Sequence, residues 1–257
     1  MKKWFLHLTL VIAVFVVGGC SGGESGTGEK IETSATNSKL IMATSADYKP
    51  FEYHELSNGE DQIVGFDLDV ANALSEQMGV ALEIRDMDYT GLLSALQSER
   101  VNFVIAAMSP TEERKKNVDF SDAYFTTKFA ALSPNEEYQS ISGLKDLKVG
   151  VQLGSTQENA AKEAGLETFA LNKFPELIQE LNTGRIDAVL VEETVASEYI
   201  EQNPGKLKAG VIEDLPGLDV AIAFPKGSLH VEEFNKAINA LRENGKLKEI
   251  EDKWFMR

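Results

Sequence analysis

A pair of similar segments, 85 residues apart, limits the folds open to this chain more than any other feature. Residues 92–108 read LLSALQSERVNFVIAAM, and residues 177–193 read LIQELNTGRIDAVLVEE. Each segment has leucines at helical spacing, a polar break with an arginine, and then the apolar, β-branched run of a buried strand. Any helix–strand unit shares much of this pattern, so a chance likeness stays open. The alternative is an α/β protein with two similar lobes, each with its own helix–strand unit.

Strand-like and helix-like runs alternate in the same way along the rest of the chain from Lys39 onward. We expect a helix at 65–79, with Asp67 as its N-cap and Gly79 as its stop. We also expect a strand at 40–45, a strand, turn and helix in 147–165, one strand in 218–228, and helices at 229–243 and 246–254. This order favours an α/β fold with its ligand crevice beyond the carboxyl ends of the strands.

The stretch AMSPTEER, residues 107–114, places an arginine close to an expected helix start. A helix start is already positive, because of its free N–H groups and its aligned peptide dipoles. Arg114 therefore either points to water or faces an anion. Ser109 and Arg114 follow one strand of the repeated pair and Glu192 ends the other, so these groups should face the same crevice. A cationic and an anionic wall together suit a zwitterion such as an amino acid.

The first residues read MKK, then WFLHLTLVIAVFVV, then GGC. A basic start and an apolar run shorter than the about 20 residues of a membrane span indicate a signal peptide. The chain's one cysteine, Cys20, sits in a setting that resembles the lipobox of bacterial lipoproteins. We therefore expect a signal peptide at 1–19, and a lipidated Cys20 with a flexible tether at 20–38; a buried structural cysteine is the alternative. The mature chain would then be lipid-anchored on the extracytoplasmic side of the cell membrane.

Charge and motifs exclude several classes of protein. The net charge of −16 argues against nucleic acid as a partner, because binding to phosphates needs an excess of Lys and Arg. From Lys39 onward there is no G-x-x-x-x-G-K-[ST] phosphate loop and no G-x-S-x-G motif, and the chain's three histidines are too scattered for a metal site. We expect no cofactor, no metal and no catalytic residue.

Five stretches carry a resemblance to a known family: TSADYKPFEY, GFDLDVANAL, SPTEERKKNVDFSDAYF, LKVGVQLGSTQE and GRIDAVLVEETVASEY. They resemble the family 3 solute-binding proteins of polar amino acid ABC transporters, and look most like the binders of arginine, lysine and histidine. The resemblance implies the two-lobed periplasmic-binding-protein type II fold, with a ligand cleft between the lobes and a two-stranded hinge. Lobe 1 would hold 39–128 and 224–257 and lobe 2 would hold 129–223, with crossings near 126–132 and 219–224.

The resemblance also implies the roles of particular residues. Arg114 would bind the α-carboxylate of the ligand, helped by Ser109 and by Thr156 and Gln157 of the GSTQ turn. Glu192 would hold the α-ammonium group, although many relatives have an aspartate there. Tyr48 and Tyr89 would enclose the ligand side chain. Asp47, Glu52, Asp86 and Asp88 are candidate partners for a distal cation, and Glu52 leads among them.

The expected function is to capture a free amino acid, most simply arginine, with lysine or histidine as alternatives, for an ABC importer. The partners would be the permease subunits and, through Cys20, the membrane; the protein would be a monomer. A binder of glutamine or another polar amino acid stays open. So do an enzyme of the same fold resembling cyclohexadienyl dehydratases, with Glu192 as its acid or base, and a sensory or adhesion module.

Overall fold

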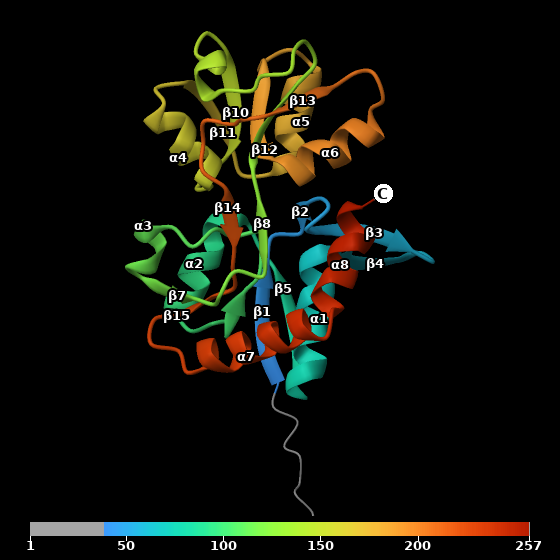
Figure 1. Ribbon diagram of the computed structural model, residues 1–257, viewed down its shortest axis with the longest axis vertical. Coiled ribbons are helices and arrows are strands. Elements are labelled where there is room, and N and C mark those ends of the chain that lie inside the picture. Colours follow the sequence, from blue (N-terminus) through green and yellow to red (C-terminus); the bar gives the residue numbers. More distant parts are fainter. Residues whose placement is uncertain (1–38, 257) are drawn as a thin grey trace, which may run out of the picture. The chain divides into compact units, whose positions relative to one another are not determined.

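The strands of the two similar segments, 92–108 and 177–193, belong to two different five-stranded sheets with the same topology (Figure 1). The strand orders are β5-β1-β6-β15-β7 and β11-β10-β12-β9-β13. The first three strands of each sheet are parallel, and the fourth runs antiparallel to the third. The strands are β1 Lys39–Thr44, β5 Ala81–Asp86, β6 Phe103–Val104, β7 Val118–Phe120 and β15 Ala223–Pro225, then β9 Phe129–Ser133, β10 Lys148–Gln152, β11 Glu167–Leu171, β12 Ala188–Glu192 and β13 Lys208–Val211. The expected α/β class with two similar halves is confirmed.

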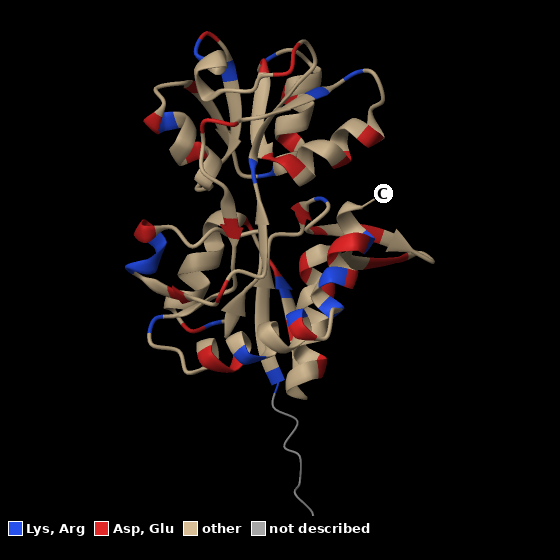
Figure 2. Ribbon diagram, in the orientation of Figure 1, with Lys and Arg blue, Asp and Glu red and all other residues tan. Residues whose placement is uncertain are grey.

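This computed structural model describes residues 39–256. The expected signal peptide, Cys20 and the tether of residues 20–38 lie outside the described residues. Within the described part of the chain, no helix is both long and apolar enough to cross a membrane. Acidic residues are spread over the helices and loops around both sheets, rather than gathered beside one of them (Figure 2).

Helices cover each sheet and connect its parallel strands. α1 and α2 link β1, β5 and β6, while α4 and α5 link β10, β11 and β12, so the repeated units 92–108 and 177–193 occupy equivalent places. The C-terminal helices α7 and α8 pack against α1, and α6 packs against β12 and β9. The helices are α1 Phe66–Met78, α2 Tyr89–Gln97, α3 Glu112–Lys115, α4 Thr156–Glu163, α5 Phe174–Asn182, α6 Glu193–Gln202, α7 His230–Glu243 and α8 Lys246–Phe255, with a short 3₁₀ helix at Ile141–Leu144.

The chain passes between the two sheets through a pair of short strands. β8 (Phe125–Thr127) and β14 (Leu218–Val220) pair antiparallel with each other and with neither large sheet. A third, small sheet projects from the first half and consists of β2 (Asp47–Tyr48), β3 (Glu52–Ser57) and β4 (Glu60–Val64). Two extended strands between the halves form the kind of connection about which such halves rotate.

Several local expectations are confirmed and two are wrong. Gly79 ends α1 in the left-handed conformation, with φ of 67°, and the two C-terminal helices lie where they were expected. Asp67 is not the N-cap of α1: Gly65 occupies that position, and Asp67 lies inside the first turn with its carboxylate turned to other partners. The expected single strand in 218–228 is two strands, because Ile222 between them donates its N–H to the Ser121 hydroxyl instead of to a ladder.

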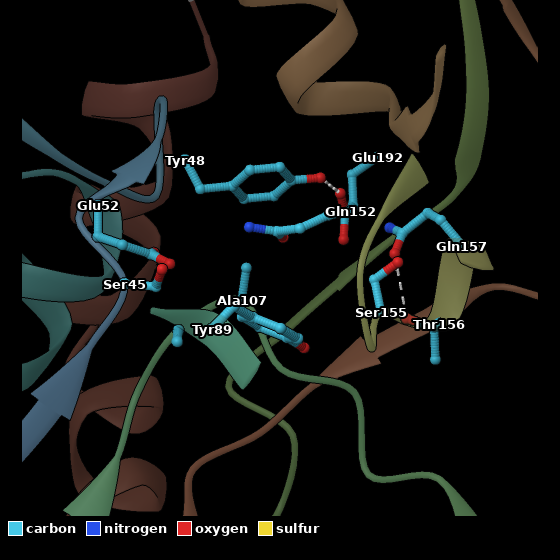
Figure 3. A pocket seen from close by; sticks show the side chains of 11 residues that line it. Ser45, Tyr48, Glu52, Tyr89, Ala107, Gln152, Ser155, Thr156, Gln157 and Glu192 are labelled. Atoms are coloured by element: carbon cyan, nitrogen blue, oxygen red, sulfur yellow. Dashed lines mark hydrogen bonds between the residues drawn. The ribbon is translucent and has the colours of Figure 1, made fainter. Parts of the chain in front are cut away.

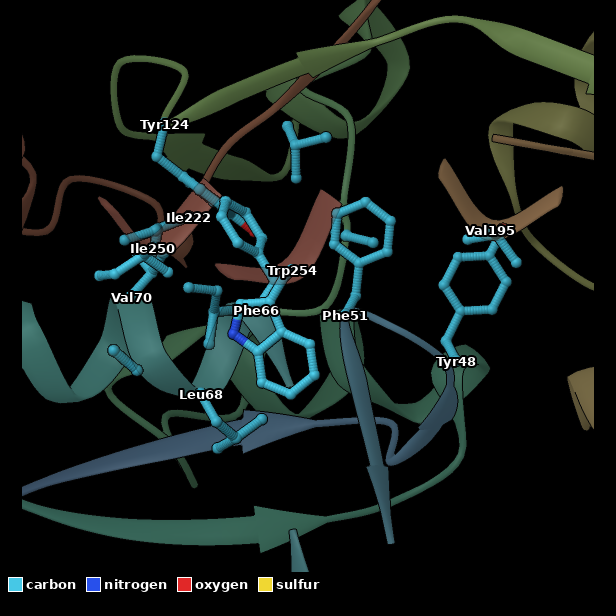
Figure 4. Packing of buried hydrophobic residues seen from close by; sticks show 14 of the residues in the cluster. Tyr48, Phe51, Phe66, Leu68, Val70, Tyr124, Val195, Ile222, Ile250 and Trp254 are labelled. Atoms are coloured by element: carbon cyan, nitrogen blue, oxygen red, sulfur yellow. The ribbon is translucent and has the colours of Figure 1, made fainter. Parts of the chain in front are cut away.

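An aromatic cluster joins the small sheet to the first half (Figure 4). Phe51 packs within 5.6–5.9 Å, centroid to centroid, of the rings of Phe66, Phe125 and Phe255. The small sheet comes this close because Gly65, with φ of 140°, has no Cβ, and a Cβ there would lie 2.0 Å from the Phe51 carbonyl oxygen. Glu52, the next residue, is therefore held directly against the start of α1.

Candidate functional site

A small pocket lies where the carboxyl ends of strands from both sheets meet (Figure 3). Gln152 ends β10 and Glu192 ends β12, while Ala106 follows β6. The cavity between these walls is only ≈ 10 Å³, about the space of one water molecule, so the walls must move apart for a larger ligand to enter. The lining residues are Ser45, Tyr48, Glu52, Tyr89, Ala106, Ala107, Gln152, Ser155, Thr156, Gln157 and Glu192.

Most of the residues that the sequence predicts to bind a ligand line this pocket, although lining it does not itself assign a role. Ser109 and Arg114 are the exceptions. Ser109 borders a more open hollow between α3 and α4, and Arg114 reaches the pocket through the side chain of Tyr89. The predicted residues in the lining are Tyr48, Glu52, Tyr89, Thr156, Gln157 and Glu192.

Arg114 does not point to water. Its side chain is buried, and its guanidinium donates to the Ser109 carbonyl at 2.8 Å, to the Tyr89 hydroxyl at 2.9 Å and to the Gly154 carbonyl at 2.9 Å. Gly154 belongs to the second half, so this arginine bridges the two halves beside the pocket. A guanidinium has five N–H donors, so these three bonds leave two for an anion.

The helix α3, which carries Arg114, is capped by Thr111 and not by Ser109. Thr111 is the N-cap of α3, and its hydroxyl accepts a hydrogen bond from the Arg114 N–H. The Ser109 hydroxyl is buried and has no hydrogen-bond partner among the residues that the structure describes. Buried hydroxyls normally have a partner, so this one is a candidate donor or acceptor for a bound molecule.

The corresponding turn in the second half also begins a helix. Gly154 turns with φ of 78°, and the Ser155 hydroxyl caps α4 by accepting from the Glu158 N–H at 3.0 Å. Thr156 and Gln157 are therefore the first two residues of α4, where backbone N–H groups are free to meet an anion. Gln157 is 3% exposed and lines the pocket.

Glu192 is a buried acid at the end of β12. The Tyr48 hydroxyl donates to its carboxylate, so the two residues join the halves across the pocket. Burial raises the pKa of Glu192, because its charged form is poorly solvated there, while Tyr48 works against that rise. A nearby cation would stabilise the ionised form.

A second acid, Glu52, lies on the opposite side of the pocket from Thr156 and Gln157 (Figure 3). Glu52 is 1% exposed, and its Oε2 has no hydrogen-bond partner among the described residues. Its neighbour Asp67 accepts from the Ala107 N–H at 2.7 Å and from the Tyr124 hydroxyl at 2.7 Å. Burial, followed by the charge of Asp67, raises the pKa of Glu52 well above its usual value; burial raises that of Asp67 to about 6. Two buried carboxyls that raise each other's cost of ionisation favour holding one proton between them, and we call them the Glu52–Asp67 pair.

The other acidic candidates are held by protein groups. Asp86 accepts from the Ala46 N–H at 2.8 Å and lies 3.2 Å from a ring nitrogen of His54. Asp47 and Asp88 both face Lys173, and none of the three aspartates lines the pocket. Glu52 is therefore the one acid of the four candidates that borders it.

Sequence reasoning missed Gln152, Ser155 and Asp67 as residues of the site. Gln152 had a usable signal, since it is the first polar side chain at the carboxyl end of the strand VGVQ. Asp67 had none in local sequence, because its contacts with Glu52 and Ala107 depend on how α1 meets the small sheet and β6. Its bond to Ala107 holds a residue whose φ is 45°, which costs energy outside glycine.

Comparison with known proteins finds relatives over almost the whole chain. The chain is 42% identical over 262 residues to the arginine-binding extracellular protein ArtP of Bacillus subtilis (strain 168), covering 99% of this chain and 98% of that protein. A solved ancestral arginine-binding protein bound to arginine is 41% identical with a TM-score of 0.77, covering 84% of this chain and 98% of its own. An ancestral arginine-binding protein bound to glutamine is 40% identical with a TM-score of 0.78, covering 85% and 98%. A family model matches residues 40–257, and the chain belongs to the bacterial extracellular solute-binding proteins, family 3.

Proposed function

We propose that this protein captures a basic amino acid, arginine first among them, and delivers it to an ABC importer. One observation carries the proposal: Arg114 and Glu192, buried and of opposite charge, come from the two halves and flank one small pocket. A zwitterion satisfies both charges at once. The arginine-bound relatives support the choice of amino acid.

The proposed roles follow from the contacts of each group. The free donors of Arg114, the Ser109 hydroxyl and the start of α4 at Thr156 and Gln157 would bind the α-carboxylate. Glu192 would bind the α-ammonium group. To do so, its carboxylate would either give up the hydrogen bond from the Tyr48 hydroxyl or accept from both groups.

The side chain of the ligand would extend between Tyr48 and Tyr89 toward Glu52. Both tyrosines line the pocket, from opposite walls in Figure 3. Stacking of a guanidinium on an aromatic face contributes about 0.5–2 kcal/mol. A cation reaching Glu52 would expel the proton of the Glu52–Asp67 pair and leave an ion pair.

Binding would close the protein about β8 and β14, since both halves contribute ligand contacts and the closed form gains all of them. We keep 39–128 with 224–257 and 129–223 as the proposed lobes. We also propose that residues 1–19 are removed, that Cys20 is lipidated, and that the monomer is held at the extracytoplasmic face of the membrane, where it meets the permease.

Glutamine is the second candidate ligand. A protonated Glu52 is neutral, and it can both donate a hydrogen bond to a side-chain amide and accept one from it. A guanidinium or ammonium group only donates hydrogen bonds, so it cannot pair with Glu52 in both ways. Titration calorimetry of the protein against arginine, lysine, histidine, glutamine and glutamate separates the two. Binding of arginine in preference to glutamine supports the proposal, and binding of glutamine alone would overturn it.

A dehydratase-like activity makes a different prediction. Glu192 would have to exchange a proton with a cyclic carboxylic acid, and its bond with Tyr48 would compete with that step. Turnover of such an acid without binding of any amino acid would refute the transport proposal.

A further inference from the structure

The helices of the two repeated units begin at equivalent positions that face each other across the two halves. Asp88 precedes α2 and Lys173 precedes α5, and these residues are 85 positions apart, like the units themselves. Their side chains form an ion pair, with Lys173 Nζ 2.7 Å from Asp88 Oδ1. The two repeated units therefore carry opposite charges at the equivalent positions 88 and 173, and these charges form an ion pair.

The start of α5 lacks a cap within its own half. Lys173 occupies the N-cap position without a side-chain cap, and a lysine there opposes the helix dipole. The missing acceptor comes from the first half: Asp47 Oδ2 accepts from the Phe174 N–H at 3.2 Å. The same oxygen lies 4.0 Å from Lys173 Nζ. Asp47 in β2 therefore supplies the missing cap, and Asp47 and Asp88 together offset the charge of Lys173.

The two aspartates stand next to the tyrosines of the pocket. Asp47 directly precedes Tyr48, and Asp88 directly precedes Tyr89. The Tyr48 ring also packs edge-on against Phe174, with centroids 4.8 Å apart. Contacts at the start of α5 therefore bear on both aromatic walls of the pocket.

We propose that the start of α5, Lys173 and Phe174, is a latch that holds the halves closed by binding Asp47 and Asp88. The latch rests on the proposed closure around an amino acid, and it adds residues that touch no ligand: they are positioning residues. When the halves open, Asp47 moves away from the start of α5. The Phe174 N–H then loses its acceptor, and Lys173 loses a nearby negative charge. Closure thus restores a satisfied helix start.

The contact with Asp47 should contribute more than the ion pair with Asp88. Asp47's side chain is 11% exposed, whereas those of Lys173 and Asp88 are 37% and 53% exposed. Exposed ion pairs contribute little, while loss of an N-cap acceptor weakens a helix by an amount worth about a fivefold change in an equilibrium constant.

The test measures the dissociation rate of arginine from the full chain by stopped flow. We expect Asp47→Ala to speed dissociation about fivefold, and Asp47→Asn, which keeps a capping oxygen, to speed it less. Lys173→Ala should speed it about twofold to threefold and Lys173→Arg should restore it. Lys226→Ala is the matched control, because Lys226 pairs with Asp119 at 2.6 Å within the first half. Equal rates for Asp47→Ala and this control would overturn the latch.

A distance measurement separates failure of the latch from failure of the proposed function. In the full chain with Cys20→Ser, spin labels at Leu56→Cys and Glu201→Cys, both exposed, report the distance between the halves. We expect Asp47→Ala and Lys173→Ala to shift the ligand-free distribution toward longer distances, and Lys226→Ala to leave it unchanged. If the original chain binds no arginine, the function proposal fails while this shift still supports the latch; no shift in either variant refutes the latch whatever the ligand. A thermal melt of each variant checks folding.

Discussion

The two ends of the candidate site are built from different kinds of contact. At the arginine end (Ser109, Arg114, Thr156 and Gln157), each group sits a few residues after a strand, in a turn that starts a helix. At the acid-pair end, Glu52 and Asp67 come from β3 and α1 and meet because Gly65 lets two backbones touch. The first end is a local motif used in both halves, and the second is a tertiary contact found in one. The first end therefore suits what all amino acids share, and the second suits what distinguishes them.

Removing the charge at the arginine end should have the largest effect. Arg114→Ala deletes the donors proposed for the carboxylate and the bond to Gly154 that joins the halves. Each charge-assisted hydrogen bond contributes about 1.5–3 kcal/mol, so affinity for every amino acid ligand should fall about a hundredfold or more. Calorimetry measures this fall, and circular dichroism checks that the variant is folded.

Arg100→Ala is the matched control for that experiment. Arg100 occupies the polar break of the same repeated unit, but it is exposed and bonds to Ser98 at the surface. We expect it to bind arginine as the original chain does. An Arg114→Ala variant that keeps its affinity would show that the guanidinium only joins the halves.

Neutralising the acid-pair end should instead change selectivity. Glu52→Gln keeps the size of the side chain and its contact with Asp67, but it cannot supply a charge to a cation. We expect arginine affinity to fall about tenfold and glutamine affinity to change little, in line with the worth of one charged hydrogen bond. Parallel titrations with both amino acids measure the ratio, and an equal loss for both would contradict the division of the pocket into two ends.

The same end predicts proton release when a cation binds. The pKa of Glu52 is raised by burial, and a bound guanidinium would lower it, so between these two values binding expels a proton. Arginine affinity should therefore rise with pH through that interval, while glutamine affinity should not. Calorimetry in two buffers of different ionisation enthalpy counts the protons, and a count of zero for arginine would exclude Glu52 as the partner of the cation.

The contrast between the ends also explains what sequence could predict. The arginine end can be sought at strand ends, small polar residues and helix starts, all of which are local, and Thr156 and Gln157 at the start of α4 line the pocket. Glu52 could be named but not chosen over Asp47, Asp86 and Asp88, because side-chain direction in the small sheet depends on the Gly65 contact. Asp67 was expected to cap its helix, and tertiary packing turned it toward Ala107 and Tyr124.

Stability should record the acid pair without any ligand. Burial raises the Asp67 pKa from 3.8 to about 6, so its deprotonation is harder in the folded chain than in the unfolded chain. The resulting stabilisation is complete below about pH 4 and is lost as pH rises through about 6. Glu52→Gln keeps a neutral hydrogen-bond donor beside Asp67 but removes the Glu52 carboxyl, whose own pKa burial raises well above its usual value, so the variant avoids the cost of ionising that buried group. The melting temperature of this variant should therefore gain on that of the original chain as pH rises, and parallel melting curves would argue against a shared proton.

The smallest effect should come from Ser109 at the arginine end. Its hydroxyl is buried and has no hydrogen-bond partner within residues 39–256, so Ser109→Ala removes an unsatisfied group and should leave the unligated fold as stable or slightly more stable. If the hydroxyl binds the carboxylate, the same change should weaken every amino acid about threefold to fivefold, the worth of one ordinary hydrogen bond. Thr111→Ala should give the opposite result, because loss of the α3 cap lowers the stability of the fold. It should affect ligand binding only by loosening the position of Arg114. Melting curves and titrations of the two variants should therefore show opposite patterns. Equal stability losses with unchanged affinities would mean that Ser109 serves the turn and not the ligand, and that this end of the pocket depends on Arg114 and the start of α4.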